Sequence, residues 1–144
     1  MLKKFFKVTS LPPYVDFSIF ILRVGVGVLM IPHGYQKLLK ILNGQFSFAD
    51  PIGFGEGSSL MLAAFAEFFC SLLLVLGFFT RTALFFLIFT MTVVVCVVKM
   101  GQGLAEMEKG LLFLIPYISL FIWGPGRYSL DYHIFGKKRG SVRN

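Results

Sequence analysis

The stretch "LMLAAFAEFFCSLLLVLGFF", Leu60–Phe79, contains twenty residues, of which only Glu67 is charged. A helix needs about 20 largely apolar residues to cross the hydrocarbon core of a bilayer. The stretch therefore predicts a membrane-spanning helix over about residues 58–79. It also raises the question of what keeps a carboxylic acid near the middle of such a helix, where a charged side chain is costly.

The rest of the chain has the same character. Hydrophobic residues make up 56% of the 144 residues and charged residues 15%, and the apolar residues occur in long blocks. A soluble domain of this size needs more charge to cover its surface. The other blocks predict membrane helices over about residues 16–42, 81–99 and 104–123. The last block is short, and it spans only if its helix begins near Leu104. The expected fold is an all-α, integral membrane four-helix bundle that forms one domain.

The basic residues predict the orientation of the bundle. With four spans, nine Lys and Arg residues lie on the side of the termini and four on the other side. The nine are Lys3, Lys4, Lys7, Arg81, Arg127, Lys137, Lys138, Arg139 and Arg143. Since positive charge favours the cytoplasmic side, both termini, segments 1–15 and 125–144, are expected in the cytoplasm. The basic tail is expected to contact anionic lipid and not nucleic acid, because no folded domain is left to present its charges.

The helical position of Glu67 predicts that its side chain faces the interior of the bundle. Ala63, Ala64, Cys70 and Ser71 lie within about 60° of it around a helix, whereas Phe65 and other bulky residues lie on the opposite side. An acid that faced lipid would show the reverse pattern.

The acid requires compensation, and the sequence leaves three candidates open: Arg23, His33 or a proton. One interpretation is a buried ion pair that fixes helix register. The other is an intramembrane polar pocket for a ligand or a proton, formed by Arg23, His33, Glu67 and Glu108. Catalytic residues are not assigned, and the sequence contains no metal-binding pattern.

Two further features concern helix packing and the longest loop. Arg23, Gly27, Met30 and Gly34 share one face of the first helix, which predicts close approach of a neighbouring helix. The loop 43–57 is apolar for a solvated segment. It is expected either to lie on the membrane surface or to fold over the mouth of the bundle as a lid.

Several short motifs resemble those of the DoxX family. They are an R-x-G-x-G run that begins at Arg23, "PHGYQKL" (Pro32–Leu38), "GFFTR" (Gly77–Arg81) and "GPGRYSLD" (Gly124–Asp131). The resemblance runs from about Arg23 to Asp131 and implies a four-helix integral membrane protein. It singles out Arg23, His33, Gly34, Lys37, Glu67, Arg81, Glu108, Gly124, Ser129 and Asp131. It also implies that Ser129 and Asp131 cap or brace the turn that holds Arg81. One position departs from the family pattern, because Lys109 stands where an aromatic residue is common.

The resemblance also supplies an expected function. Some members of the family resemble the small subunit of a thiosulfate:quinone oxidoreductase, and others accompany thiol and oxidative-stress proteins. The first hypothesis is therefore a quinone-linked redox subunit. A polar pocket walled by Phe and Met would suit a quinone ring, with Arg23 or His33 donating to its carbonyl oxygens. The alternatives are a non-enzymatic membrane anchor or assembly factor, and a carrier of small molecules or lipids.

The expected surroundings follow from the same resemblance. The predicted location is the cytoplasmic (inner) membrane of a bacterium or archaeon. The predicted partners are the lipid bilayer, a soluble or membrane redox partner, and a second copy of the chain.

Overall fold

The computed structural model describes residues 11–136, apart from the side chain of Glu106. Within this range every regular element is a helix. The elements are α2 Pro13–Leu42, α3 Glu56–Ala64, η1 Phe65–Cys70, α4 Ser71–Leu76, α5 Thr80–Val93, η2 Val94–Val98, α6 Leu104–Trp123 and α7 Leu130–Phe135. Seven of the nine basic residues that predicted the orientation lie outside the described residues: Lys3, Lys4, Lys7, Lys137, Lys138, Arg139 and Arg143.

The elements α3, η1 and α4 follow one another without a break and form one continuous rod, with the π-helical segment η1 in its centre. In this segment the hydrogen bonds run over five residues and widen the helix locally, an irregularity that is frequent at functional sites. Glu67 lies within it. The rod ends at Gly77, whose φ of 70° places it in the left-handed region that glycine adopts without strain.

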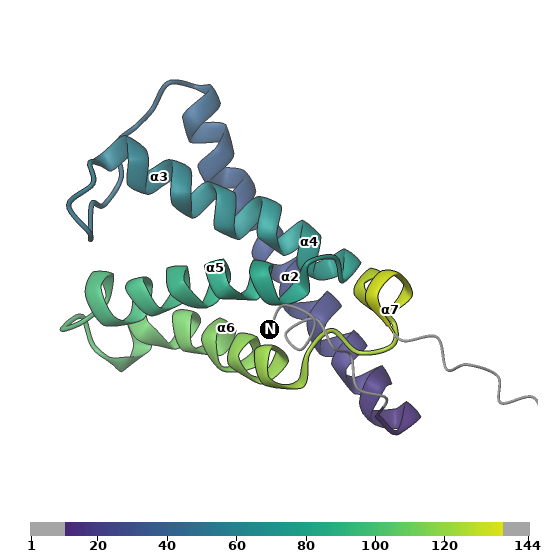
Figure 1. Ribbon diagram of the computed structural model, residues 1–144. Helices are drawn as coiled ribbons and strands as arrows, with labels where there is room; N and C mark the ends of the chain where they lie inside the picture. Colours follow the sequence, from purple (N-terminus) through teal and green to yellow (C-terminus); the bar gives the residue numbers. More distant parts are fainter. Residues whose placement is uncertain (1–10, 137–144) are drawn as a thin grey trace, which may run out of the picture.

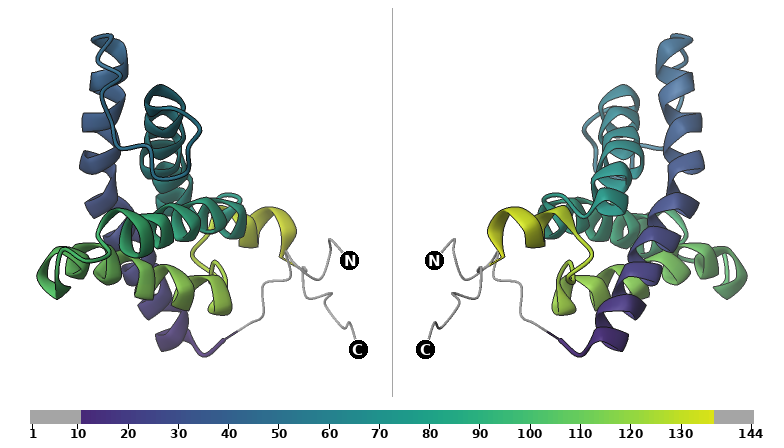
Figure 2. Two further views of the ribbon diagram at one scale, coloured as in Figure 1. Left: turned by 90° about the vertical axis from the view of Figure 1, so that its left-hand side faces the viewer. Right: turned by 90° about the vertical axis from the view of Figure 1, so that its right-hand side faces the viewer.

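The helices form two pairs that meet at one end and diverge at the other (Figure 1). The helix α2 packs along the whole rod α3–η1–α4, while α5 packs along α6. The contacts between the two pairs involve η1 and α4 much more than α3, so the space between α3 and α5 widens toward the loop 43–55. Figure 2 shows that α5 and α6 cross the direction of α2 at a wide angle.

The face of α2 predicted to pack inward is the buried face. Its buried residues include Arg23, Gly27, Met30 and Gly34. The apolar core joins this face to α4, α5 and α6 through side chains such as Leu74, Leu84, Leu87 and Leu120. The outward faces of the long helices are also apolar, as Leu29, Phe85 and Ile122 illustrate.

Three helices in the described part of the chain are long and apolar enough to cross a membrane: Pro13–Leu42, Glu56–Leu76 and Thr80–Val98. The helix α6, Leu104–Trp123, is not among these three, and it carries Glu108 and Lys109 near its first turn. The short helix α7 was not predicted. Its six residues follow a sharp turn at "GPGR", and the side chain of Ser129 caps its first turn.

Candidate functional site

Glu67 forms an ion pair with Lys37, a residue that was not among the candidates for its partner. The Lys37 ammonium donates a hydrogen bond to Glu67 Oε2. The Glu67 side chain is 3% exposed and that of Lys37 21% exposed, so the acid is buried and its cation reaches a more open space. The ion pair therefore lies at the boundary between the packed helices and a cavity.

The close packing of α2 on η1 brings this pair together. A Cβ atom added to Gly34 would lie 2.5 Å from the carbonyl carbon of Glu67 and 2.7 Å from its carbonyl oxygen. Only a residue without a side chain permits that approach. Lys37 lies one turn after Gly34 on the same side of α2, so its long side chain reaches the carboxylate of Glu67.

The cavity beside the ion pair has a volume of about 280 Å³ and lies in the widening space between α3–η1 and α5–η2. Lys37 and Glu67 line one part of it. Most of the other lining residues are apolar: Leu62, Ala63, Phe65, Ala66, Phe85, Phe86, Phe89, Val93, Val94 and Val98. The site is therefore an apolar chamber with one charged pair.

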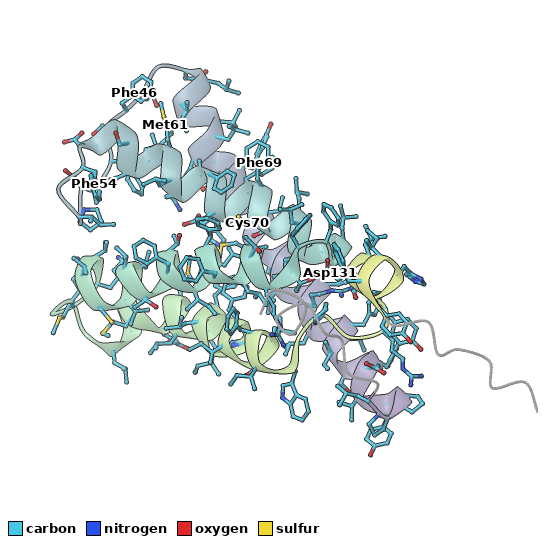
Figure 3. All side chains as sticks on the ribbon, viewed as in Figure 1. Phe46, Phe54, Met61, Phe69, Cys70 and Asp131 are labelled. Atoms are coloured by element: carbon cyan, nitrogen blue, oxygen red, sulfur yellow. The ribbon has the colours of Figure 1, made fainter. Side chains whose placement is uncertain are left out.

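The loop 43–55 contributes Phe48, Pro51 and Ile52 to the cavity lining. Of the two alternatives left open by the sequence, this arrangement fits a lid. The Lys37 ammonium lies 5.9 Å from the centre of the Phe48 ring, within the range of a cation–π contact. Figure 3 shows Phe46 and Phe54 of the same loop at the open end of the helix pairs.

Asp50 holds this loop in shape. Its carboxylate accepts hydrogen bonds from the backbone N–H groups of Gly53, Phe54 and Gly55 and from the hydroxyl of Ser59. These bonds favour the ionised form, and the bond from Gly55 contributes most to lowering the pKa of Asp50. The loop is thus closed on itself before α3 begins.

Arg23 lies at the other end of the bundle, away from Glu67. Arg23 is 1% exposed, and its guanidinium donates to the carbonyl oxygens of Pro125, at 2.7 Å, and Tyr128. Gly77 makes room for it, because a Cβ atom there would lie 2.5 Å from Arg23 Nη1. Arg23 does not meet Glu67 as expected, because its side chain extends toward Pro125 and Tyr128 and not toward the middle of α2.

His33 and Glu108 do not line the cavity either. Both side chains are exposed. The His33 ring stands edge-on to Phe113 of α6, with the ring centres 6.0 Å apart. The predicted four-residue pocket therefore separates into an ion pair at the cavity, a buried arginine at the opposite end and two exposed side chains.

The motif "GPGRYSLD" braces the turn between α4 and α5. The Asp131 carboxylate accepts from the backbone N–H groups of Phe79 and Thr80, both at 2.8 Å, and Figure 3 shows Asp131 where α7 meets the end of α4. Phe79 has a φ of 46°, a left-handed conformation that is unusual for a bulky residue. Asp131 stabilises this turn by accepting its N–H groups.

Two other motif residues, Ser129 and Arg81, complete the brace. Ser129 is the N-cap of α7, where its hydroxyl accepts from the Tyr132 N–H. Arg81 lies next to Gly124, with its Nη2 atom 3.5 Å from where a Cβ of Gly124 would stand. Both residues therefore help to hold the end of the bundle together.

Sequence reasoning missed Asp16, Asp50 and Tyr117. Asp16 is fully buried, and it accepts from the Arg127 backbone N–H at 3.1 Å and pairs with the Arg127 side chain at 3.2 Å. A signal existed for Asp16, which lies two turns before Arg23 on the same helical face. Tyr117 has no such signal, because nothing in the sequence around it predicts that α6 buries its hydroxyl.

The architecture defines the class of protein first: an all-α, multi-pass integral membrane protein. The family follows from comparison with known families, because the DoxX family model matches residues 18–100. The chain belongs to the DoxX family. The matched residues include Lys37, Glu67 and the cavity lining but not α6 or α7. No curated protein and no solved structure matches the chain.

Proposed function

We propose that this chain is the quinone-binding membrane subunit of an oxidoreductase. The observation that carries the proposal is an apolar cavity of about 280 Å³ lined by the Lys37–Glu67 pair. Its volume is near the lower end of the range of about 300–1,000 Å³ for small-molecule sites. Such sites combine apolar walls with a few polar groups that orient the ligand.

The chemistry of the lining fits a quinone. The phenylalanine side chains of the walls offer edge and face contacts to a flat ring. The Lys37 ammonium replaces Arg23 and His33 as the proposed donor to a carbonyl oxygen, because it is the cation that lines the cavity. Glu67 fixes the position of this ammonium and can exchange a proton with it.

The electrons are proposed to come from a partner. Conversion of a quinone to a quinol takes up two electrons and two protons, and oxidation of a dithiol to a disulfide releases the same number of each. Cys70 and Cys96 of this chain are both free, and one is buried while the other is exposed. We therefore assign the dithiol, or an equivalent reduced sulfur compound, to a soluble or membrane redox partner.

Binding of decylubiquinone to the purified protein in nanodiscs tests the proposal. Ala63→Phe places a ring inside the cavity and is expected to weaken binding at least about tenfold, which corresponds to about 1.4 kcal/mol. Ala105→Phe is the matched control, because Ala105 is exposed on α6 and does not line the cavity. Equal binding by both variants would show that the quinone does not occupy this site.

A carrier of small apolar molecules or lipids is the second candidate, and the lateral walls favour it. Phe65, Phe85 and Phe89 line the cavity and are also 45–60% exposed on the outer surface, so an apolar molecule can reach the cavity from the bilayer. Lys37→Met separates the candidates. If the chain binds quinone, this variant should bind decylubiquinone more weakly and a hydrocarbon probe of similar size equally well. If the chain is a carrier without carbonyl recognition, the variant should bind both probes as well as the unaltered protein does.

The orientation is part of the same proposal. We propose four spans, with α6 as the fourth, in a bacterial or archaeal inner membrane, with both termini in the cytoplasm and the loop with Gly53 outside. Single cysteines at Asn144 and Gly53, in a background where Cys70 and Cys96 are replaced by alanine, should react with an impermeant reagent from opposite sides. Labelling of Asn144 in intact cells would contradict this orientation.

A further inference from the structure

Three buried hydroxyl groups have no hydrogen-bond partner within the described part of the chain, and one of them, on Thr80, lies at the turn braced by Asp131. The other two belong to Ser71, at the start of α4, and Tyr117, on α6, and both residues are fully buried. An unsatisfied buried hydroxyl is costly, and phenylalanine or alanine would remove that cost. Hydroxyls that the resting structure does not use can be required in another state of the protein.

Both hydroxyls lie close to the ion pair. Ser71 follows Glu67 by four residues, about one turn along the same rod. The Tyr117 hydroxyl is near the Ser71 hydroxyl and interacts electrostatically with the Glu67 carboxylate. The Tyr117 ring packs against Phe113, with the ring centres 6.1 Å apart, so its hydroxyl is held at this depth.

The charges around Glu67 show when these donors would be needed. Two titratable groups of the described residues that interact with it are Lys37 from α2 and Tyr117 from α6. From α5 and η2, the cavity lining contributes phenylalanines, valines and Thr90, none of which is charged near neutral pH. If Lys37 turned toward a ligand in the cavity, Glu67 would be a buried carboxylate without a cation, which is strongly unfavourable.

We propose that Tyr117 and Ser71 are the reserve hydrogen-bond donors of Glu67. When Lys37 turns its ammonium to a carbonyl or anionic oxygen of a ligand, the flexible Glu67 side chain accepts from the two hydroxyls instead and remains ionised. Tyr117 and Ser71 are positioning residues in this scheme, because they act on the ligand only through Glu67 and Lys37. The ligand step rests on the proposed function of the cavity.

The exchange of partners can be tested without a ligand. Lys37→Met removes the cation, as ligand binding would, and infrared spectroscopy follows the carbonyl stretch of the protonated Glu67 carboxyl as a function of pH. The midpoint of this band should lie at least about one pH unit higher in Lys37→Met/Tyr117→Phe/Ser71→Ala than in Lys37→Met, a tenfold shift of the proton equilibrium. Addition of Glu67→Gln should abolish the band. Identical midpoints would overturn the proposal.

A second measurement uses variants that keep Lys37 and are expected to fold. Tyr117→Phe should leave thermal stability equal or higher, because it removes an unsatisfied hydroxyl, and should weaken decylubiquinone binding about tenfold. Tyr35→Phe is the matched control, because Tyr35 is 49% exposed on α2. A purely structural role of Tyr117 predicts the reverse, namely lower stability with unchanged binding, and that result would overturn the proposal.

The two proposals fail in different ways. If the unaltered protein does not bind decylubiquinone, the quinone function is wrong, while the infrared midpoints still decide whether the hydroxyls support Glu67. If the unaltered protein and Tyr117→Phe bind equally well and the midpoints coincide, the reserve-donor proposal is wrong and the quinone function stands.

Discussion

At Gly34 the helix α2 lies directly against the backbone of η1, and Gly34→Ala is expected to push the two helices apart. The added Cβ would lie 2.5 Å from the Glu67 carbonyl carbon, whereas ordinary van der Waals contact begins at 3.4 Å. The difference, about 0.9 Å, has to be taken up by movement of a helix, because the atoms that the Cβ meets belong to the backbone and cannot rotate away.

The structure gives the size and the order of the effect. Overpacking of this kind costs about 1–3 kcal/mol, and we expect the upper end for Gly34→Ala because the clash is with backbone. Gly27→Ala should cost less, since the nearest atom to its Cβ is a methyl group of the Val75 side chain. Gly25→Ala meets nothing within 4 Å and should stabilise the helix by about 0.5–1 kcal/mol.

Thermal unfolding of the three variants in one detergent checks this series, with Gly25→Ala as the control on the same helix. The expected order of stability is Gly25→Ala, then Gly27→Ala, then Gly34→Ala. Gly34→Ala should also weaken decylubiquinone binding. When the added methyl group pushes η1 away from α2, Glu67 on η1 moves away from Lys37 on α2. If Gly34→Ala is as stable as Gly25→Ala, α2 does not pack on η1 as the structure describes.

Three other perturbations have defined outcomes. Lys37→Met should destabilise the fold by about 2 kcal/mol in thermal unfolding. This is less than the roughly 3–5 kcal/mol for breaking a fully buried pair, because Lys37 is partly exposed. The double variant Lys37→Met/Glu67→Gln should recover most of the lost stability, because it leaves no unpaired charge. Asp131→Ala should cost about 2–3 kcal/mol by removing the acceptor of two N–H groups, and unchanged melting would refute the brace. The pKa of Asp50 is lowered in the fold, so its stabilisation of the loop is present above the unfolded pKa of about 3.9 and is lost as the pH falls through the lower folded value. Limited proteolysis should therefore cut the loop of Asp50→Ala already at neutral pH, whereas the unaltered loop should remain protected there, and equal cleavage would refute its role.

The local patterns of the sequence predicted much of the fold because burial in a helix follows from periodicity. The inward face of α2 could be predicted from Arg23, Gly27 and Gly34, and the inward direction of Glu67 from the small residues around it. The α7 helix could not be predicted in this way. Its six residues are too few to form a stable helix alone. Ser129 caps its first turn, and Asp131 holds it against the turn between α4 and α5.

The partner of Glu67 was also outside the reach of the sequence. Depth along a straight helix favoured Arg23 or His33, but a side chain of several rotatable bonds can extend toward either end of its helix. Arg23 extends toward Pro125 and Tyr128 because Gly77 leaves space there. That choice leaves Lys37 as the cation that compensates the acid.

The sequence by itself determined that this chain is apolar in long blocks, that it forms helices long enough to cross a bilayer, and that Glu67 faces inward. These properties depend on composition and on the helical repeat, which are local. Only the tertiary structure decided which cation meets Glu67, where the cavity lies and which hydroxyls are left without partners. Those properties depend on how closely two helices approach and where they diverge, and the absence of one side chain at Gly34 sets that distance between residues more than thirty positions apart in the chain.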